Sequence, residues 1–83
     1  MISPAQCRAA RGLLDWTQPD LAKAAGVGAT TVRQFELGGA DPRNATLAVI
    51  KLAFEAAGVE FLDANGAGPG LRLKKNEASA LRA

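Results

Sequence analysis

The chain has 83 residues, a formal net charge of +2, 22% charged side chains and 5% aromatic ones. This length suits one small domain, whose core must consist largely of alanine, leucine and valine on closely packed helices. The sequence has no histidine, and its single cysteine excludes an internal disulfide. It also lacks a nucleophile paired with a base, a phosphate-binding glycine loop and an acidic cluster. We therefore expect no enzymatic activity and no metal or cofactor.

A membrane role is not expected either. No run of residues approaches the roughly 18 apolar positions of a membrane span, and the N-terminus lacks the pattern of a secretory signal, so we expect a cytoplasmic protein. The charge is uneven, with +2 in residues 1–35, −3 in residues 36–63 and +3 in residues 64–83. The basic regions can meet a polyanion, although ordinary solvated charge explains the count equally well.

Capping signals place the first two helices. Residues 3–6 read Ser-Pro-Ala-Gln, a capping box with proline at the first helical position, which predicts a helix over residues 4–14. Residues 17–20 read Thr-Gln-Pro-Asp and predict a second helix that ends at residue 24 or 25. Gly26 then ends this helix, because glycine adopts the left-handed conformation at low cost.

Two further helices follow, and each is bounded by glycine. The third is predicted over residues 29–37 and is stopped by Gly38; its inward positions are Val32, Phe35 and Glu36, and its outward positions are Thr30, Arg33 and Gln34. Asn44 is the predicted N-cap of the fourth helix, which ends at Gly58. The apolar residues of this helix recur at helical spacing and are Leu47, Ile50, Phe54 and Ala57.

Beyond Gly58 the apolar residues alternate, which predicts a β-hairpin over residues 59–74. Its strands are residues 59–62 and 71–74, and the turn signals Asn-Gly and Gly-Pro-Gly lie between them. We expect one domain over residues 1–75 and a disordered tail over residues 76–83. The predicted fold is mainly α, a bundle of four to five helices with a C-terminal β-hairpin.

The helices at residues 17–25 and 29–37, separated by a glycine turn, have the arrangement of a helix-turn-helix. The apolar residues that would join them are Leu21, Ala22, Val27 and Val32. Small helical bundles also contain such pairs, so periodicity alone leaves both interpretations open.

A longer pattern resembles the Xre family of helix-turn-helix regulators, which includes the lambdoid phage repressors. The matching residues are Trp16-Thr17-Gln18, Leu21-Ala22, Ala25-Gly26-Val27, Thr31-Val32, Phe35-Glu36, Gly38 and Pro42. The resemblance covers residues 3–58 and implies a bundle of about five helices that dimerises and places its third helix in the DNA major groove. A hairpin takes the place of the fifth helix here, so the usual family dimer geometry is not carried over.

The resemblance also implies which residues bind double-stranded DNA. Gln18 and Arg43 match positions that contact backbone phosphates. The matches to positions at or beside the base edges are Gly28, Ala29, Thr30, Thr31, Arg33 and Gln34. Glutamine can pair with adenine and methyl groups can pack on thymine, which favours half-sites that contain A and T. Gly28 departs from the serine or threonine common at its position, so one hydroxyl is missing there.

Several other residues are expected to be structural. Arg11 matches a family arginine that pairs inside the domain with the glutamate at the end of the third helix, here Glu36. The aromatic residues of the predicted core are Trp16, Phe35 and Phe54. Cys7 is expected to be a small core residue, with redox sensing as the alternative.

The hairpin is the expected dimer interface. An isolated two-stranded hairpin is marginally stable in water and needs a surface to pack on, and its apolar residues are Phe61, Leu62, Leu71 and Leu73. The alternative is a hairpin that only closes the core of one chain. Lys74 and Lys75 could add phosphate contacts or keep a strand edge soluble.

Together these features predict a small homodimeric, sequence-specific DNA-binding regulator, a repressor at a palindromic operator. Its regulation would come from its concentration, from operator competition or from a partner protein. The alternative is a protein-interaction module, such as an antitoxin or antiactivator, that uses the helix-turn-helix surface to bind another protein.

Overall fold

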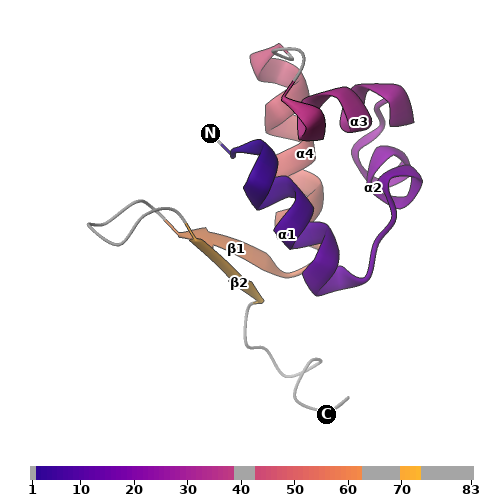
Figure 1. Cartoon of the computed structure of the whole chain (residues 1–83). Helices are drawn as coiled ribbons and strands as arrows, with labels where there is room; N and C mark the ends of the chain where they lie inside the picture. Colours follow the sequence, from indigo (N-terminus) through magenta and orange to yellow (C-terminus); the bar gives the residue numbers. More distant parts are fainter. Residues whose placement is uncertain (1, 39–42, 63–69, 74–83) are drawn as a thin grey trace.

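The computed structural model describes residues 2–38, 43–62 and 70–73, and within them the chain forms four helices and one hairpin (Figure 1). The helices are α1 Pro4–Leu14, α2 Gln18–Ala25, α3 Ala29–Leu37 and α4 Asn44–Ala56, and the strands are β1 Val59–Leu62 and β2 Gly70–Leu73. The predicted fold class, a mainly helical bundle with a C-terminal hairpin, is confirmed. The tail predicted over residues 76–83 and both Lys74 and Lys75 lie outside the described residues.

Local hydrogen bonds start the first two helices as predicted. The Ser3 hydroxyl accepts from the Gln6 backbone N–H at 3.1 Å, and the Gln6 side chain accepts from the Ser3 N–H at 2.9 Å. Thr17 and Asp20 make the same reciprocal pair at the start of α2, at 3.1 and 2.9 Å. Hydrogen bonds from Thr17, above all from its backbone N–H, hold the pKa of Asp20 below its ordinary value, because they favour the charged carboxylate.

The prediction for the start of α4 was wrong by one residue. Arg43, not Asn44, has the extended backbone of the N-cap, and it makes no side-chain cap hydrogen bond. Asn44 is therefore the first helical residue, and its side chain is not at the position from which it could cap. The helix ends at Ala56, two residues before Gly58, whose φ of 102° lets the chain turn into β1.

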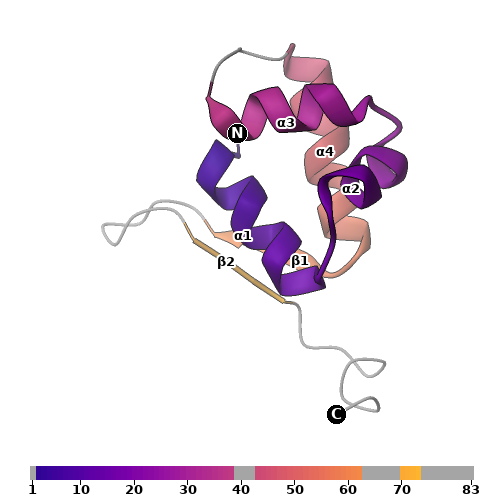
Figure 2. The same ribbon diagram turned by 45° about the vertical axis from the view of Figure 1, so that its right-hand side comes forward.

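The hairpin packs on α1 and α4 (Figure 2). Its strands pair antiparallel, with Val59 opposite Leu73 and Phe61 opposite Leu71. The second strand begins at Gly70, one residue earlier than predicted, and the described part ends at Leu73. The Gln6 side-chain amide donates to the Gly70 carbonyl at 3.3 Å, so a buried polar group links α1 to β2.

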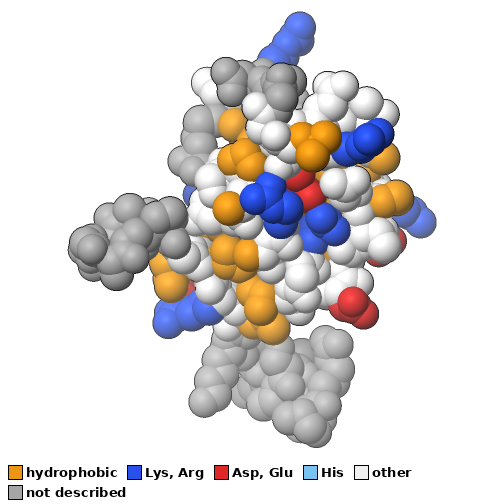
Figure 3. Space-filling model, viewed as in Figure 1, with side chains coloured by type: hydrophobic (Ala, Val, Ile, Leu, Met, Phe, Trp, Pro, Cys, Tyr) orange, Lys and Arg blue, Asp and Glu red, His pale blue; other side chains and the backbone are white. Residues whose placement is uncertain are grey.

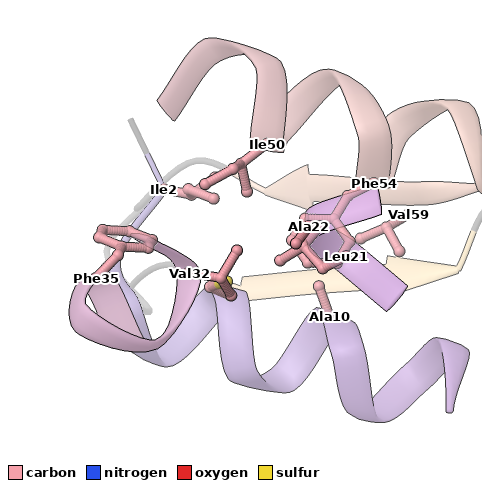
Figure 4. Packing of buried hydrophobic residues seen from close by; sticks show 10 residues of the cluster. Ile2, Ala10, Leu21, Ala22, Val32, Phe35, Ile50, Phe54 and Val59 are labelled. Atoms are coloured by element: carbon pink, nitrogen blue, oxygen red, sulfur yellow. The ribbon is translucent and has the colours of Figure 1, made fainter. Parts of the chain in front are cut away.

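The core lies between the helices and the inner face of the hairpin (Figure 4). Phe54 is fully buried, and its ring stacks on Trp16 at 5.9 Å and meets the edge of Phe61 at 6.0 Å. Cys7 and Phe35 are also buried, so the predicted core roles of these residues are confirmed. The remaining buried apolar residues are Ile2, Ala10, Leu21, Ala22, Val32, Ile50 and Val59.

A buried carboxylate joins the first three helices. Glu36 of α3 is only 4% exposed, and both of its carboxylate oxygens accept from the Arg11 guanidinium of α1 at 2.7 Å. Gln18 of α2 donates to the same carboxylate at 3.1 Å, and the Cys7 thiol donates at 3.1 Å. Arg8 donates to the Glu36 backbone carbonyl. We call these five residues the Glu36 cluster; it confirms the predicted pairing of Arg11 with Glu36.

The cluster controls the protonation of its members. Burial raises the pKa of Glu36, but the hydrogen bonds from Arg11, Gln18 and Cys7 outweigh this effect and leave that pKa below its ordinary value. Burial, followed by the neighbouring Glu36 carboxylate, raises the pKa of the Cys7 thiol well above its ordinary value. The carboxylate is therefore charged and the thiol is neutral at physiological pH.

Removal of the cation should destabilise the fold. In Arg11→Ala the buried Glu36 carboxylate loses its main partner, so we expect the free energy of unfolding to fall by about 3 kcal/mol. The double variant Arg11→Met/Glu36→Leu removes both charges and should recover much of this loss. Chemical denaturation of the three proteins measures the effect, and an Arg11→Ala protein as stable as the parent would contradict it.

The same pair should make stability dependent on pH. The pKa of Glu36 is lowered in the folded state, so its contribution is present above the unfolded pKa and is lost as the pH falls through the folded pKa. Below about pH 4 the parent should therefore lose more stability, relative to pH 7, than Arg11→Met/Glu36→Leu does. Denaturation curves at pH 7, 5 and 3.5 test this, and equal losses would show that Glu36 does not carry the dependence.

Candidate nucleic-acid interface

The second and third helices form a fixed pair. The left-handed Gly26, with a φ of 72°, ends α2, and the N–H of Val27 donates to the Ala22 carbonyl at 3.0 Å. Leu21 and Val32 are fully buried. Because α2 and α3 contact each other directly, the tight turn and the core together set the direction in which α3 projects.

Helix α3 has one buried face and one exposed face. Val32, Phe35 and Glu36 are buried, whereas Thr30, Arg33 and Gln34 are exposed, as the periodicity predicted. Gly28 and Ala29 are also exposed, and Thr31 is half-buried at the edge of this face. The structure thus brings six of the sequence-predicted DNA-binding residues to one helix and its N-cap.

Leu37 was not among the residues predicted from the sequence to bind DNA. Its side chain is 72% exposed, the largest value among the exposed large hydrophobic residues that the structure describes. It follows Thr30 by seven positions, Arg33 by four and Gln34 by three, so it lies on the same face of α3. That spacing was the signal available in the sequence. We call Thr30, Arg33, Gln34 and Leu37, with Ala29, the exposed face of α3.

Gln18 is held at the start of α2 by the Glu36 cluster. It is the first residue of α2 and is half-buried, and its amide nitrogen donates to Glu36 at 3.1 Å. A primary amide carries two N–H donors, so this contact uses only one of them. The internal contact was not predicted, because the two residues are 18 positions apart.

Arg43 lies at the same end of the molecule as α3, but at the start of α4. It is exposed at the N-cap of α4, and both ribbon views show α3 beside the N-terminal end of α4 (Figures 1 and 2). Basic side chains gather around a small acidic patch near α1 and α3 (Figure 3). Arg8 and Arg11 are engaged with Glu36, while Arg33 and Arg43 are exposed.

The four hairpin residues do not form one exposed surface. The register places Val59, Phe61, Leu71 and Leu73 on one face of the hairpin and Leu62 on the other. Phe61 and Leu71 are half-buried and pack against the core, while Leu62 and Leu73 are 38% and 46% exposed. On the outer face, Arg72 and Glu60 form an exposed ion pair at 3.2 Å.

Other kinds of site have little support in the part of the chain that the structure describes. No group of three or more cysteine and acidic side chains there could hold a metal ion. Nor does any described helix have the length and apolar character needed to cross a membrane.

Comparison with known proteins supports the helix-turn-helix. No curated protein matches the chain. The family model HTH_3, described as helix-turn-helix, matches residues 8–62, which is more than half of the chain. This range contains α2, α3 and α4 in full, and it covers all the residues of the exposed face of α3. The protein therefore belongs to the Xre and lambda-repressor-like helix-turn-helix family of DNA-binding regulators.

Proposed function

We propose that this protein binds double-stranded DNA sequence-specifically as a homodimer and acts as a transcriptional repressor at a palindromic operator in the cytoplasm. The observation that carries this proposal is the exposed face of α3, which presents hydrogen-bonding side chains while its opposite face is buried. A helix of this width fits the major groove. A repressor can act by occupying a promoter, and occupancy requires only DNA binding. Repression therefore needs no further activity from this domain.

The exposed face of α3 has the chemistry to read bases. The Gln34 amide can donate to and accept from one adenine edge, and the methyl groups of Ala29 and Thr30 can pack against thymine. Arg33 carries donors that suit guanine or a phosphate. These groups favour half-sites that contain A·T pairs.

Phosphate contacts would fix the position of α3 in the groove. The second N–H of Gln18 lies at the positive N-terminal end of α2, where an anion is favoured. Gly28 and the Thr31 hydroxyl are at the start of α3, and Arg43 is at the start of α4. These contacts carry affinity more than sequence information.

A second candidate function is the binding of another protein, as an antitoxin or antiactivator does. The exposed Leu37 is the observation that favours it, because an apolar side chain at 72% exposure suits a protein surface. Arg33 and Gln34 beside it favour nucleic acid instead. A regulatory partner protein that covers this face would compete with DNA.

Substitutions on the two kinds of contact should have different effects. Gln34→Ala should lose discrimination at one base position by about 1–3 kcal/mol per half-site, because a bidentate base contact is removed. Arg43→Ala should weaken binding to all sequences alike and reduce the slope of log K against log salt by about 1 per protomer. Binding isotherms on a selected operator and on random duplex, at several salt concentrations, measure both effects.

The matched control is Lys23→Ala, an exposed cation of α2 to which no DNA contact is assigned. If Gln34→Ala and Arg43→Ala bind both duplexes as the parent does, the exposed face of α3 is not the docking face.

We further propose that the hairpin contributes to the dimer contact through Phe61, Leu62, Leu71 and Leu73. Leu62 is exposed on the outer face of the hairpin and Leu73 on the inner face, while Phe61 and Leu71 pack against the core. Deletion of the hairpin is an unsuitable test, because Val59 is fully buried and its loss would open the core.

The exposed leucines give a cleaner test. Leu62→Ser/Leu73→Ser should keep the melting temperature close to that of the parent but raise the dimer dissociation constant and weaken operator binding, because apolar contact area is lost. Sedimentation equilibrium and operator titration measure the two effects. Leu13→Ser is the matched control, since Leu13 is 44% exposed on α1. A double variant that dimerises like the parent would remove the hairpin from the interface.

A further inference from the structure

The outer face of α4 is apolar and has no partner among the described residues. Its five residues are Ala45, Ala48, Val49, Leu52 and Ala56, and all are exposed. They fall within about 100° of the helix circumference. Leu52 is 62% exposed and Val49 is 37% exposed, whereas Ile50 and Phe54 on the opposite face are fully buried. We call these five residues the outer stripe of α4.

The spacing within the stripe is that of a helix seam. Ala45, Val49, Leu52 and Ala56 follow one another at intervals of four, three and four residues, which is the a/d spacing of a heptad repeat. Val49 then occupies an a position and Leu52 a d position. A β-branched residue at a with leucine at d favours two parallel strands. The alanines at both ends allow two helices to approach closely.

We propose that a second copy of this chain packs on the outer stripe, with the two α4 helices parallel and in register. This inference rests on the proposed function, a dimer that reads one duplex. Helix α3 lies beside the N-terminal end of α4 in both ribbon views (Figures 1 and 2). A two-fold axis along α4 keeps both α3 helices at the same end, where one duplex can meet them. An antiparallel pair would place them at opposite ends.

The charges beside the stripe agree with this symmetry. Lys51 and Glu55 lie on one side of the stripe, and Thr46 and Ala53 lie on the other. In a parallel pair, the two-fold axis places the side of one helix that carries Lys51 and Glu55 against the side of its partner that carries Thr46 and Ala53. Charged residues of one copy therefore meet uncharged residues of the other, so the contact brings no like charges together.

The C-terminal end of the stripe is close to the hairpin along the chain. Ala45 and Ala56 are eleven residues apart, about 16 Å along the helix, which is short for a dimer contact that typically buries about 1,200 Å² or more. Strand β1 begins three residues after Ala56, so the same axis brings both hairpins to one end of the dimer. Leu62 and Leu73 can extend the contact there.

Cysteine crosslinking tests the direction and the register. Two residues related by a parallel, in-register pair lie close enough for a disulfide. Under mild oxidation without DNA, Ala45→Cys and Ala56→Cys should each form a disulfide-linked dimer, at least about tenfold more than the control Ala24→Cys, an exposed alanine of α2. The parent protein gives the background level of crosslinking, because its single cysteine, Cys7, is fully buried.

Two outcomes would overturn the proposal. If neither variant crosslinks alone but an equimolar mixture of the two does, the helices pair antiparallel. If crosslinking of both variants and of their mixture stays at the level of Ala24→Cys, the outer stripe is not a contact between copies.

A charge at the centre of the stripe gives an independent measurement. Leu52→Lys should raise the dimer dissociation constant by at least about tenfold, because two lysines would face each other across the axis. Leu52 is exposed, so the variant should fold like the parent, and Leu13→Lys is the matched control. An unchanged constant in Leu52→Lys would contradict the proposal. Both experiments are done without DNA, so failure of operator binding and failure of this contact are observed separately.

Discussion

A charged carboxylate in the interior of a small domain needs partners, and in this protein Glu36 obtains them from two other helices. Arg11 supplies a two-point contact from α1, and Gln18 supplies an amide from α2. Each of these hydrogen bonds has a narrow geometry, so α3 cannot rotate or slide without exposing or orphaning the charge. The orientation of the exposed face of α3 therefore depends on an interaction on its opposite side.

This arrangement also explains how Gln18 is prepared for its proposed role. Its amide is held at the start of α2 by the same carboxylate that fixes α3. A proposed phosphate contact and the base-reading surface thus share one buried anchor. A binding surface held by packed elements loses less conformational entropy when it docks.

Apolar surface is distributed over two faces of the molecule for different reasons. The inner face of the hairpin completes the core, because Val59 and Phe61 pack against Phe54 and its neighbours. The outer stripe of α4 lies on the opposite side of that helix from Ile50 and Phe54. The core covers only one of the two apolar sides of this helix, and the other side is the surface that we propose for the contact between copies.

Interactions between residues close in the chain could be predicted from the sequence, because their geometry follows from the helix itself. The capping boxes, the glycine stops and the two faces of α3 belong to this group. The resemblance to a known family added the pairing of Arg11 with Glu36. The exact start of α4 was missed, since one residue more or less changes the local energy little.

Only the tertiary structure could show that Cys7 and Gln18 also meet at Glu36, from 29 and 18 positions away. The same holds for the hairpin, where alternation places Phe61, Leu71 and Leu73 on one face but does not show which of them the core covers. The helix packing decided that Phe61 and Leu71 pack against the core while Leu73 remains exposed. Periodicity determines which residues share a face, whereas the neighbour of that face depends on how the elements pack in space.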